Sequence, residues 1–337
     1  MANHNPGVRV GLALGSGAAR GWGHIGVIRA LEEAGYVPAW VAGTSMGALV
    51  GAMYAAGKLD ELEDFARSLT PSRVMSYLDL VVPVRGLLQG DKVRDMLRGF
   101  LGELSVDRTL IPFCAVSTDL ASGREMRLLE GNLVDAVYAS IAIPGIFVPA
   151  TYDGRFLVDG GLSSPVPVEA VRALGAGRII AVDLNHNGGE CDWCPPRPAS
   201  GAPARPRAMA PRPAPGANEA AHALALAATQ GQHRLKLGVL ERRYREMETA
   251  LRERTFRWIM RAPRPNVFDV IGSSINMVTI AMTRVTLAKS RPDLVICPAL
   301  GQFNLWDFHD AAPAIAEGYA STRQALEQQP LLNASMG

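Results

Sequence analysis

The chain has 337 residues, which is enough for one large domain with a sizeable core. Apolar residues make up 48% and charged residues 20% of it, proportions that are ordinary for a globular protein and exclude a fibrous or disordered chain. The formal net charge of +2 gives no indication of nucleic-acid binding, and we expect no such partner. Four cysteines in this length argue against a disulfide framework.

The N-terminal sequence gives an expectation about location. Residues 1–6 lack the basic region and the apolar run that begin a secretory leader. No stretch reaches the roughly 18 uninterrupted apolar residues that a membrane-spanning helix needs. We therefore expect a cytoplasmic protein that is at most peripheral to the inner face of a membrane.

The first predicted element is a buried strand over 8–14, and a glycine-rich turn over 15–21 joins it to a helix over 22–34. Such a turn presents several backbone N–H groups and can hold either a phosphate or the oxyanion of a reaction. Its glycines miss the dinucleotide-binding spacing by one residue, and no Lys-Ser/Thr pair marks a P-loop. An oxyanion hole is therefore the favoured interpretation.

A second strand–turn–helix unit is centred on the sequence Gly43-Thr44-Ser45-Met46-Gly47. This is the setting of a G-x-S-x-G nucleophile elbow, in which flanking glycines allow a turn too tight for a Cβ atom. The Ser45 oxygen would lie at the positive end of the next helix, and the Met46 N–H would be free to stabilise an oxyanion. The alternative is a glycine-rich turn with an incidental serine.

The remaining predicted elements alternate between strands and helices, which favours a three-layer α/β/α fold with a mostly parallel central sheet. We expect further helices over 58–69, 92–101, 133–142, 165–174, 267–289 and 311–326, and further strands over 111–116, 155–158, 178–184 and 293–297.

Residues 190–264 differ in composition from the rest and are predicted to interrupt the core, which would consist of 1–189 and 265–337. They carry 14 Lys and Arg against 7 Asp and Glu, and eight prolines lie between 195 and 215. The prolines are typical of an extended linker. A basic amphipathic helix predicted over 219–261 would rest on an anionic membrane surface, cover an apolar site as a lid, or pack on the sheet.

A C-x-x-C motif lies in the same segment, at Cys191 and Cys194, and such a motif can bind zinc or perform redox chemistry. Zinc sites usually have a second pair, whereas Cys114 and Cys297 fall on separate predicted strands. We therefore expect unpaired thiols, no metal and no other cofactor.

Ser45 needs a group that accepts its proton. A Ser–Asp–His triad would use Asp183 and His309, but the serine of an α/β-hydrolase follows several strands and Ser45 follows only the second. Asp159 ends a predicted strand, and the two glycines after it let the backbone turn beside another loop. Asp159 is therefore the better candidate base, with an ordinary Asp-Gly turn as the alternative.

Three motifs carry a resemblance to a known family: Gly15-Ser16-Gly17-Ala18-Ala19-Arg20-Gly21, Gly43-Thr44-Ser45-Met46-Gly47 and Asp159-Gly160-Gly161. In their order and approximate spacing they resemble the motifs of the patatin-like phospholipases, specifically of the bacterial branch related to neuropathy target esterase. The resemblance covers 8–186 strongly and 266–326 more weakly. Residues 139–147 and 117–120 also look like segments of that family. Many members have three consecutive glycines in the first loop, where this chain has Ser16 in the middle place.

The resemblance implies a Ser–Asp dyad without histidine. Ser45 would attack an ester carbonyl, and Asp159 would take its proton and later activate water. The implied substrate is a phospholipid or lysophospholipid acyl ester, and no cofactor is implied. The alternatives are a broader carboxylesterase, thioesterase or acyltransferase on the same dyad, or a non-catalytic membrane-binding scaffold.

The resemblance also implies an oxyanion hole in the first loop. The backbone N–H groups would come from Gly15, Ser16 and Gly17, with a further one from Met46. Arg20 would either brace this loop or meet a lipid phosphate, and the brace is favoured.

Overall fold

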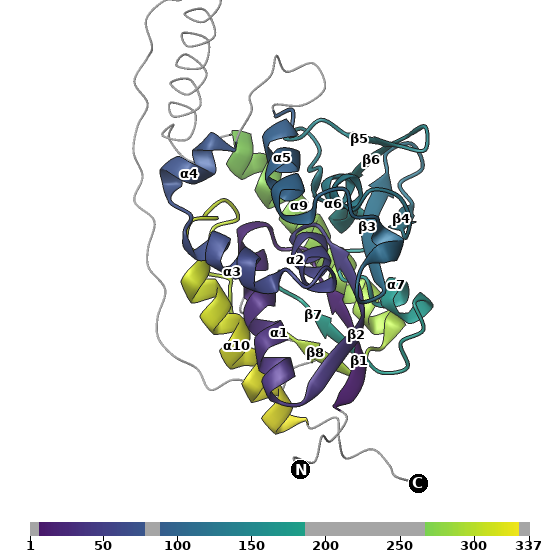
Figure 1. Cartoon of the computed structure of the whole chain (residues 1–337), viewed down its shortest axis with the longest axis vertical. Helices are drawn as coiled ribbons and strands as arrows, with labels where there is room; N and C mark the ends of the chain where they lie inside the picture. Colours follow the sequence, from purple (N-terminus) through teal and green to yellow (C-terminus); the bar gives the residue numbers. More distant parts are fainter. Residues whose placement is uncertain (1–6, 78–87, 186–266, 330–337) are drawn as a thin grey trace, which may run out of the picture. The chain divides into compact units, whose positions relative to one another are not determined.

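The computed structural model describes residues 7–77, 88–185 and 267–329 (Figure 1). The predictions for the linker and helix over 190–264, and for Cys191 and Cys194, lie outside these residues.

The strands of the described residues form one eight-stranded mixed sheet in the order β5-β6-β3-β2-β1-β7-β8, with β4 paired to β3. Neighbours from β3 through β2, β1 and β7 to β8 run parallel, whereas β4 and β6 run antiparallel to β3 and β5 runs antiparallel to β6. The strands are β1 (Val8–Leu14), β2 (Tyr36–Thr44), β3 (Phe113–Asp119), β4 (Glu125–Leu128), β5 (Ala150–Tyr152), β6 (Arg155–Asp159), β7 (Ile179–Val182) and β8 (Leu294–Ile296).

Helices cover both faces of this sheet (Figure 1), and short 3₁₀ turns connect several elements. The helices are α1 (Gly23–Glu33), α2 (Met46–Ala55), α3 (Leu59–Arg67), α4 (Pro71–Ser76), α5 (Asp91–Leu101), α6 (Leu133–Ile141), α7 (Val168–Ala173), α9 (Val267–Ser290) and α10 (Ala311–Gln328). The 3₁₀ turns are η1 (Ala18–Trp22), η2 (Val106–Arg108) and η3 (Gly160–Leu162).

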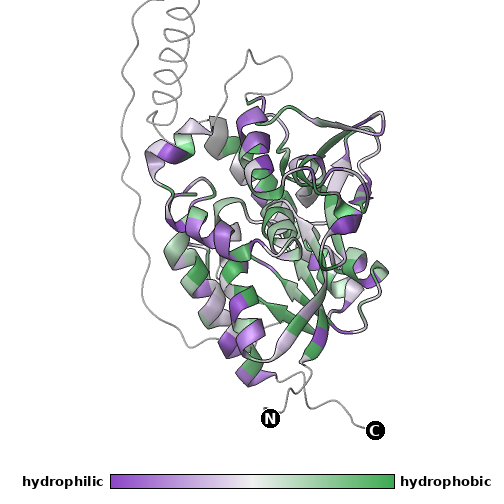
Figure 2. Cartoon of the chain, viewed as in Figure 1, coloured by the Kyte–Doolittle hydropathy of each residue, from purple (hydrophilic) through white to green (hydrophobic). Residues whose placement is uncertain are grey.

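Alternate residues of the central strands face opposite layers, as the two-residue period of a strand requires. Leu12 and Leu14 of β1 belong to the larger core, which also contains buried residues of α1, α2, α6 and α10. Ala13 of β1 and Ala42 of β2 belong to the smaller core, with residues of α7 and Leu287 of α9. The predicted three-layer α/β/α fold is confirmed, with antiparallel strands added at one end of the sheet. In Figure 2 the central strands are mostly hydrophobic, while α3 and α5 carry hydrophilic residues.

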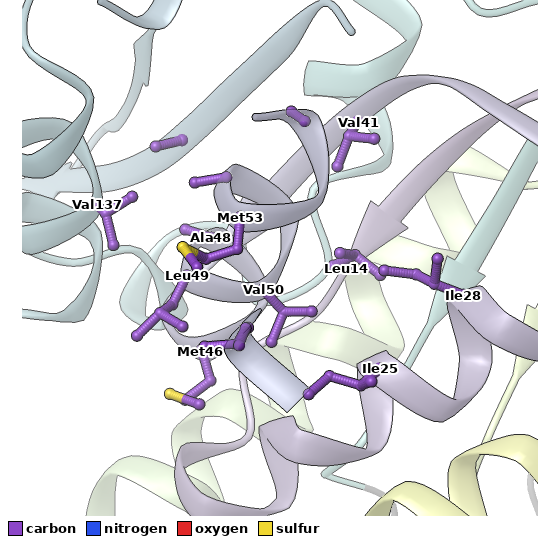
Figure 3. Close-up of a cluster of buried hydrophobic side chains, with 14 of the residues drawn as sticks. Leu14, Ile25, Ile28, Val41, Met46, Ala48, Leu49, Val50, Met53 and Val137 are labelled. Atoms are coloured by element: carbon purple, nitrogen blue, oxygen red, sulfur yellow. The ribbon is translucent and has the colours of Figure 1, made fainter. Parts of the chain in front are cut away.

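α2 is buried on every side, and all of its residues except Tyr54 are buried. Because the N-terminus of α2 directly follows Ser45, this packing fixes the position of the candidate nucleophile. Figure 3 shows side chains of α2 among residues from β1, β2, α1 and α6. The labelled residues are Leu14, Ile25, Ile28, Val41, Met46, Ala48, Leu49, Val50, Met53 and Val137.

Among the described residues, α9 contains a segment, Val270–Ser290, that could cross a membrane by length and composition alone. No such helix was expected from the sequence, because serine, threonine and asparagine interrupt its apolar residues. Only 22% of the apolar window in this segment is buried, and α9 packs against α7 and η3.

Candidate active site

The register of β3 brings the candidate nucleophile and base together. β2 runs parallel to β3, and its last residue, Thr44, pairs with Val116. β6 runs antiparallel to β3, and its last residue, Asp159, pairs with Ser117. Two strands from distant parts of the chain therefore end at consecutive residues of β3. Because Ser45 directly follows Thr44, it lies beside Asp159.

Ser45 and Asp159 form a direct hydrogen bond. The Ser45 hydroxyl donates to Asp159 Oδ2 at 2.6 Å, and the two residues are only 5% and 3% exposed. The Gly161 N–H donates to the other carboxylate oxygen at 2.7 Å, which orients the carboxylate. Burial raises the pKa of Asp159 to about 6, although both hydrogen bonds act to lower it. The carboxylate is thus ionised at neutral pH and is a stronger base than an exposed aspartate.

The Ser45 backbone has φ 56° and ψ −124°, a conformation that residues with a side chain rarely adopt. Ser140 accepts a hydrogen bond from the Ser45 N–H at 2.9 Å and donates one to the Val116 carbonyl. A Cβ atom at Gly47 would lie 2.2 Å from the Leu14 carbonyl oxygen, so only glycine fits there. The surrounding structure therefore holds Ser45 in a strained turn, as a nucleophile elbow requires.

The glycines of the three predicted motifs lie at contacts between those motifs. Gly21 lies against the Met46 side chain and Gly47 against the Gly15 carbonyl, while Gly160 lies against the Thr44 side chain. The structure therefore brings all three motifs to one place at the ends of β1, β2 and β6.

The first loop uses two of its N–H groups to attach itself to the core. The Gly15 N–H donates to the Val182 carbonyl at 3.0 Å, and the Ser16 N–H donates to the Pro165 carbonyl at 2.8 Å. The resemblance implied that both N–H groups would face an oxyanion. The structure differs, because each of them already donates to a carbonyl.

Three other N–H groups remain at the site. Among the residues that the structure describes, no acceptor is found for the N–H groups of Gly17, Ala18 and Met46. Ala18 begins η1 and Met46 begins α2, and the first N–H groups of a helix have no partner within it. Ala18 was missed from sequence, although its place at the start of a helical turn is a usable signal.

Ala18 adopts φ 47°, in the left-handed region that favours glycine. Ala18→Gly is expected to raise the free energy of unfolding by up to about 1 kcal/mol, because relief of strain exceeds the entropy that glycine adds to the unfolded chain. Ala18→Val is expected to lower kcat, because a β-branched residue would shift this loop. Urea unfolding and initial rates check both changes. An equal kcat for the two variants would contradict a role for the loop conformation in catalysis.

Buried polar side chains support the first loop from the inside. Asn185 Nδ2 donates to the Ser16 carbonyl at 2.9 Å and contacts the Ser16 hydroxyl at 3.0 Å. His24 Nε2 lies 2.7 Å from the Gly15 carbonyl. Burial lowers the pKa of His24 to about 4, so the ring is neutral at pH 7 and its Nε2 carries the donated proton. Neither His24 nor Asn185 was identified as a supporting residue from sequence, since each is a single polar residue outside the motifs.

Arg20 is 6% exposed, and its Nε donates to the Phe303 carbonyl at 3.1 Å. Burial lowers the pKa of its guanidinium, and the nearby Asp183 charge acts in the opposite direction. This contact joins the first loop to the segment before α10, the geometry of a brace.

The alternative triad is not assembled. His309 is exposed in the turn before α10, and the Asp183 carboxylate accepts a hydrogen bond from the Asn185 N–H at 3.0 Å. Within the described ranges, Ser45 donates to Asp159, and no group of three or more His, Cys, Asp or Glu could hold a metal ion.

Residues 12–172 match the profile of the patatin-like phospholipase family. An uncharacterised NTE family protein of Mycobacterium tuberculosis is 46% identical over 177 residues, which are 52% of this chain and 49% of that protein. Neuropathy target esterase sws of Drosophila melanogaster is 30% identical over 191 residues, or 55% of this chain and 13% of that protein. Among solved structures, VipD from Legionella pneumophila has a TM-score of 0.43 and 13% identity, covering 96% of this chain and 67% of that chain.

Residues 12–172 carry a patatin-like phospholipase domain with the patatin fold, as the sequence motifs predicted. The chain's match spans about half the length of the mycobacterial relative, 49%.

Proposed function

We propose that this protein is a serine acyl hydrolase that cleaves phospholipid or lysophospholipid acyl esters through Ser45 and Asp159. The observation that carries the proposal is the 2.6 Å hydrogen bond from the Ser45 hydroxyl to a buried carboxylate. The raised pKa of that carboxylate, about 6, suits a group that must accept a proton near neutral pH. The patatin-like phospholipase match supports a lipid ester as the substrate.

In the first half of the reaction, Ser45 Oγ attacks the acyl carbonyl carbon and its proton passes to Asp159 Oδ2. Negative charge develops on the carbonyl oxygen, where the N–H groups of Gly17, Ala18 and Met46 stabilise it. The positive end of α2 adds to that stabilisation. Asp159 then gives its proton to the leaving alcohol oxygen as the ester bond breaks, which leaves an acyl group on Ser45.

In the second half, water attacks the acyl carbonyl and loses a proton to Asp159. The same N–H groups stabilise the oxyanion again. The Ser45–acyl bond breaks, Asp159 returns its proton to Ser45 Oγ, and a fatty acid leaves. One carboxylate therefore acts as base and acid in both halves, and neither His24 nor His309 takes part.

The proposal predicts fatty-acid release from lysophosphatidylcholine or phosphatidylcholine by the full chain, measured by mass spectrometry. His309→Ala should release it at a rate within about twofold of the unchanged protein, because His309 is exposed and Ser45 donates to Asp159. Loss of activity in folded His309→Ala would contradict the dyad. Hydrolysis of palmitoyl-CoA but of neither lipid would instead assign a thioesterase to the same site.

A further inference from the structure

α9 buries mainly small polar residues and exposes several large apolar ones, which an ordinary surface helix does not do. The buried residues recur at steps of three and four, so they share one side of the helix. They are Thr279, Thr283, Leu287 and Ser290. The large apolar residues on the opposite side are about half exposed or more. They are Val270 (52%), Met277 (64%), Val278 (47%) and Val285 (64%), and we call them the outward face of α9.

α9 also borders the candidate active site. It packs against η3, the turn that directly follows Asp159. Near its start, Ile271 lies against Gly145, in the loop that follows α6, and Gly272 lies against Trp306, in the segment before α10. The α6 helix supplies Ser140, which fixes the Ser45 backbone. α9 therefore lies between its outward face and the turn that follows Asp159.

The charges on α9 indicate what would cover this face. From Val270 to Ser290 the helix has no Asp or Glu, while Arg284 and Lys289 are exposed toward its C-terminal end. On a helical projection both cations fall within or beside the outward face. Apolar side chains with flanking cations match the acyl boundary and anionic headgroups of a lipid surface.

Two other occupants fit less well. The outward face has four large apolar side chains, far fewer than the roughly 20 to 30 residues that each partner contributes to a stable protein interface, so a second copy is disfavoured. Residues 190–264 of this chain carry 14 Lys and Arg against 7 Asp and Glu, so the cations of α9 disfavour this segment as a cover.

We propose that the outward face of α9 docks into the surface of an anionic membrane and holds the Ser45 site at the lipid. The claim that docking brings the enzyme to its substrate rests on the proposed function. The docking itself needs no turnover, so the two can fail separately.

The test uses full-length Ser45→Ala protein, which leaves the lipid intact, and measures its sedimentation with vesicles of phosphatidylcholine and phosphatidylglycerol. Met277→Glu/Val285→Glu in that background should weaken binding by at least about tenfold, because two carboxylates would meet the acyl boundary. The matched control is Leu110→Glu, at a 78% exposed leucine outside α9, and it should bind as before. Binding should fall between about 50 and about 500 mM NaCl and should be weaker on phosphatidylcholine alone.

Circular dichroism establishes that each variant is folded. If the two glutamates unfold the chain, Met277→Ser/Val285→Ser replaces them in the binding test. Equal binding by the double variant and the control would overturn the proposal. The proposal would also be overturned if light scattering showed that the protein is a dimer and that the double substitution dissociates it. The outward face would then bind a second copy of the chain. If the unchanged protein bound vesicles but hydrolysed no ester, the docking would stand and the proposed function would be contradicted.

Discussion

Replacing Ser45 with alanine is expected to lower kcat by a factor of about 10⁴ to 10⁶, with the fold intact. The hydroxyl is the nucleophile of the proposed mechanism and the hydrogen-bond donor to Asp159 Oδ2. No other described hydroxyl donates to that oxygen, so none can replace it. Stopped assays on lysophosphatidylcholine, with active-site labelling by a fluorophosphonate, measure the loss. Residual activity above about 1% of the unchanged protein would contradict the assignment of the nucleophile.

Ser45→Gly is the matched variant, because it also removes the hydroxyl but tolerates the strained backbone. At φ 56° and ψ −124° glycine is nearly free of the cost that alanine bears. We expect both variants to be inactive and Ser45→Gly to be more stable than Ser45→Ala by about 1 kcal/mol in urea unfolding. Equal stability would show that the turn holds Ser45 without strain.

Asp159→Asn is expected to lower kcat by a factor of about 10³ to 10⁴ and, at pH 8, to make the protein more stable. In the folded chain the pKa of Asp159 is about 6, above its ordinary value of 3.8, so folding favours the protonated form. Stability contributed by that protonated form is complete below about pH 4 and is lost as the pH rises through about 6. Asparagine does not titrate, so the advantage of the variant should grow over this range to about 3 kcal/mol.

Urea unfolding at pH 4, 6 and 8 measures this change. Asp119→Asn is the matched control on β3, because hydrogen bonds from Ser122, Ala121 and Arg155 hold the pKa of Asp119 below its ordinary value. That substitution should therefore lower stability at pH 8. The hydrolysis rate of the unchanged protein should rise with pH up to about 6 and then level off, since the base must be ionised. A less stable Asp159→Asn at pH 8 would contradict the raised pKa.

The sequence supplied most of the fold because its longer elements have strong periodic patterns. The strand over 8–14 was predicted with the bounds that the structure shows, and the predicted helix over 311–326 lies within Ala311–Gln328. The short strands Glu125–Leu128 and Ala150–Tyr152 were missed, because three or four residues are too few to show a period.

At the site, the sequence indicated the candidate catalytic residues but not which backbone N–H groups face the reacting atoms. Motif spacing pointed to Ser45 and Asp159, and the structure brings these two side chains into contact. Which N–H groups of the first loop are already engaged depends on the carbonyls of Val182 and Pro165, far along the chain. The exposure pattern of α9 likewise depends on what packs beneath it, so composition could not predict it.

The way in which β3 aligns the ends of β2 and β6 has a consequence for how the protein matures. The nucleophile and its base are separated by 114 positions along the chain. The ends of β2 and β6 are brought together only through their pairing with β3. Closing so long a loop is among the late and slow events of folding. An N-terminal fragment that stops before β6 would carry the G-x-S-x-G turn but no base. A nascent or partly folded chain would therefore lack this dyad, whatever membrane it meets.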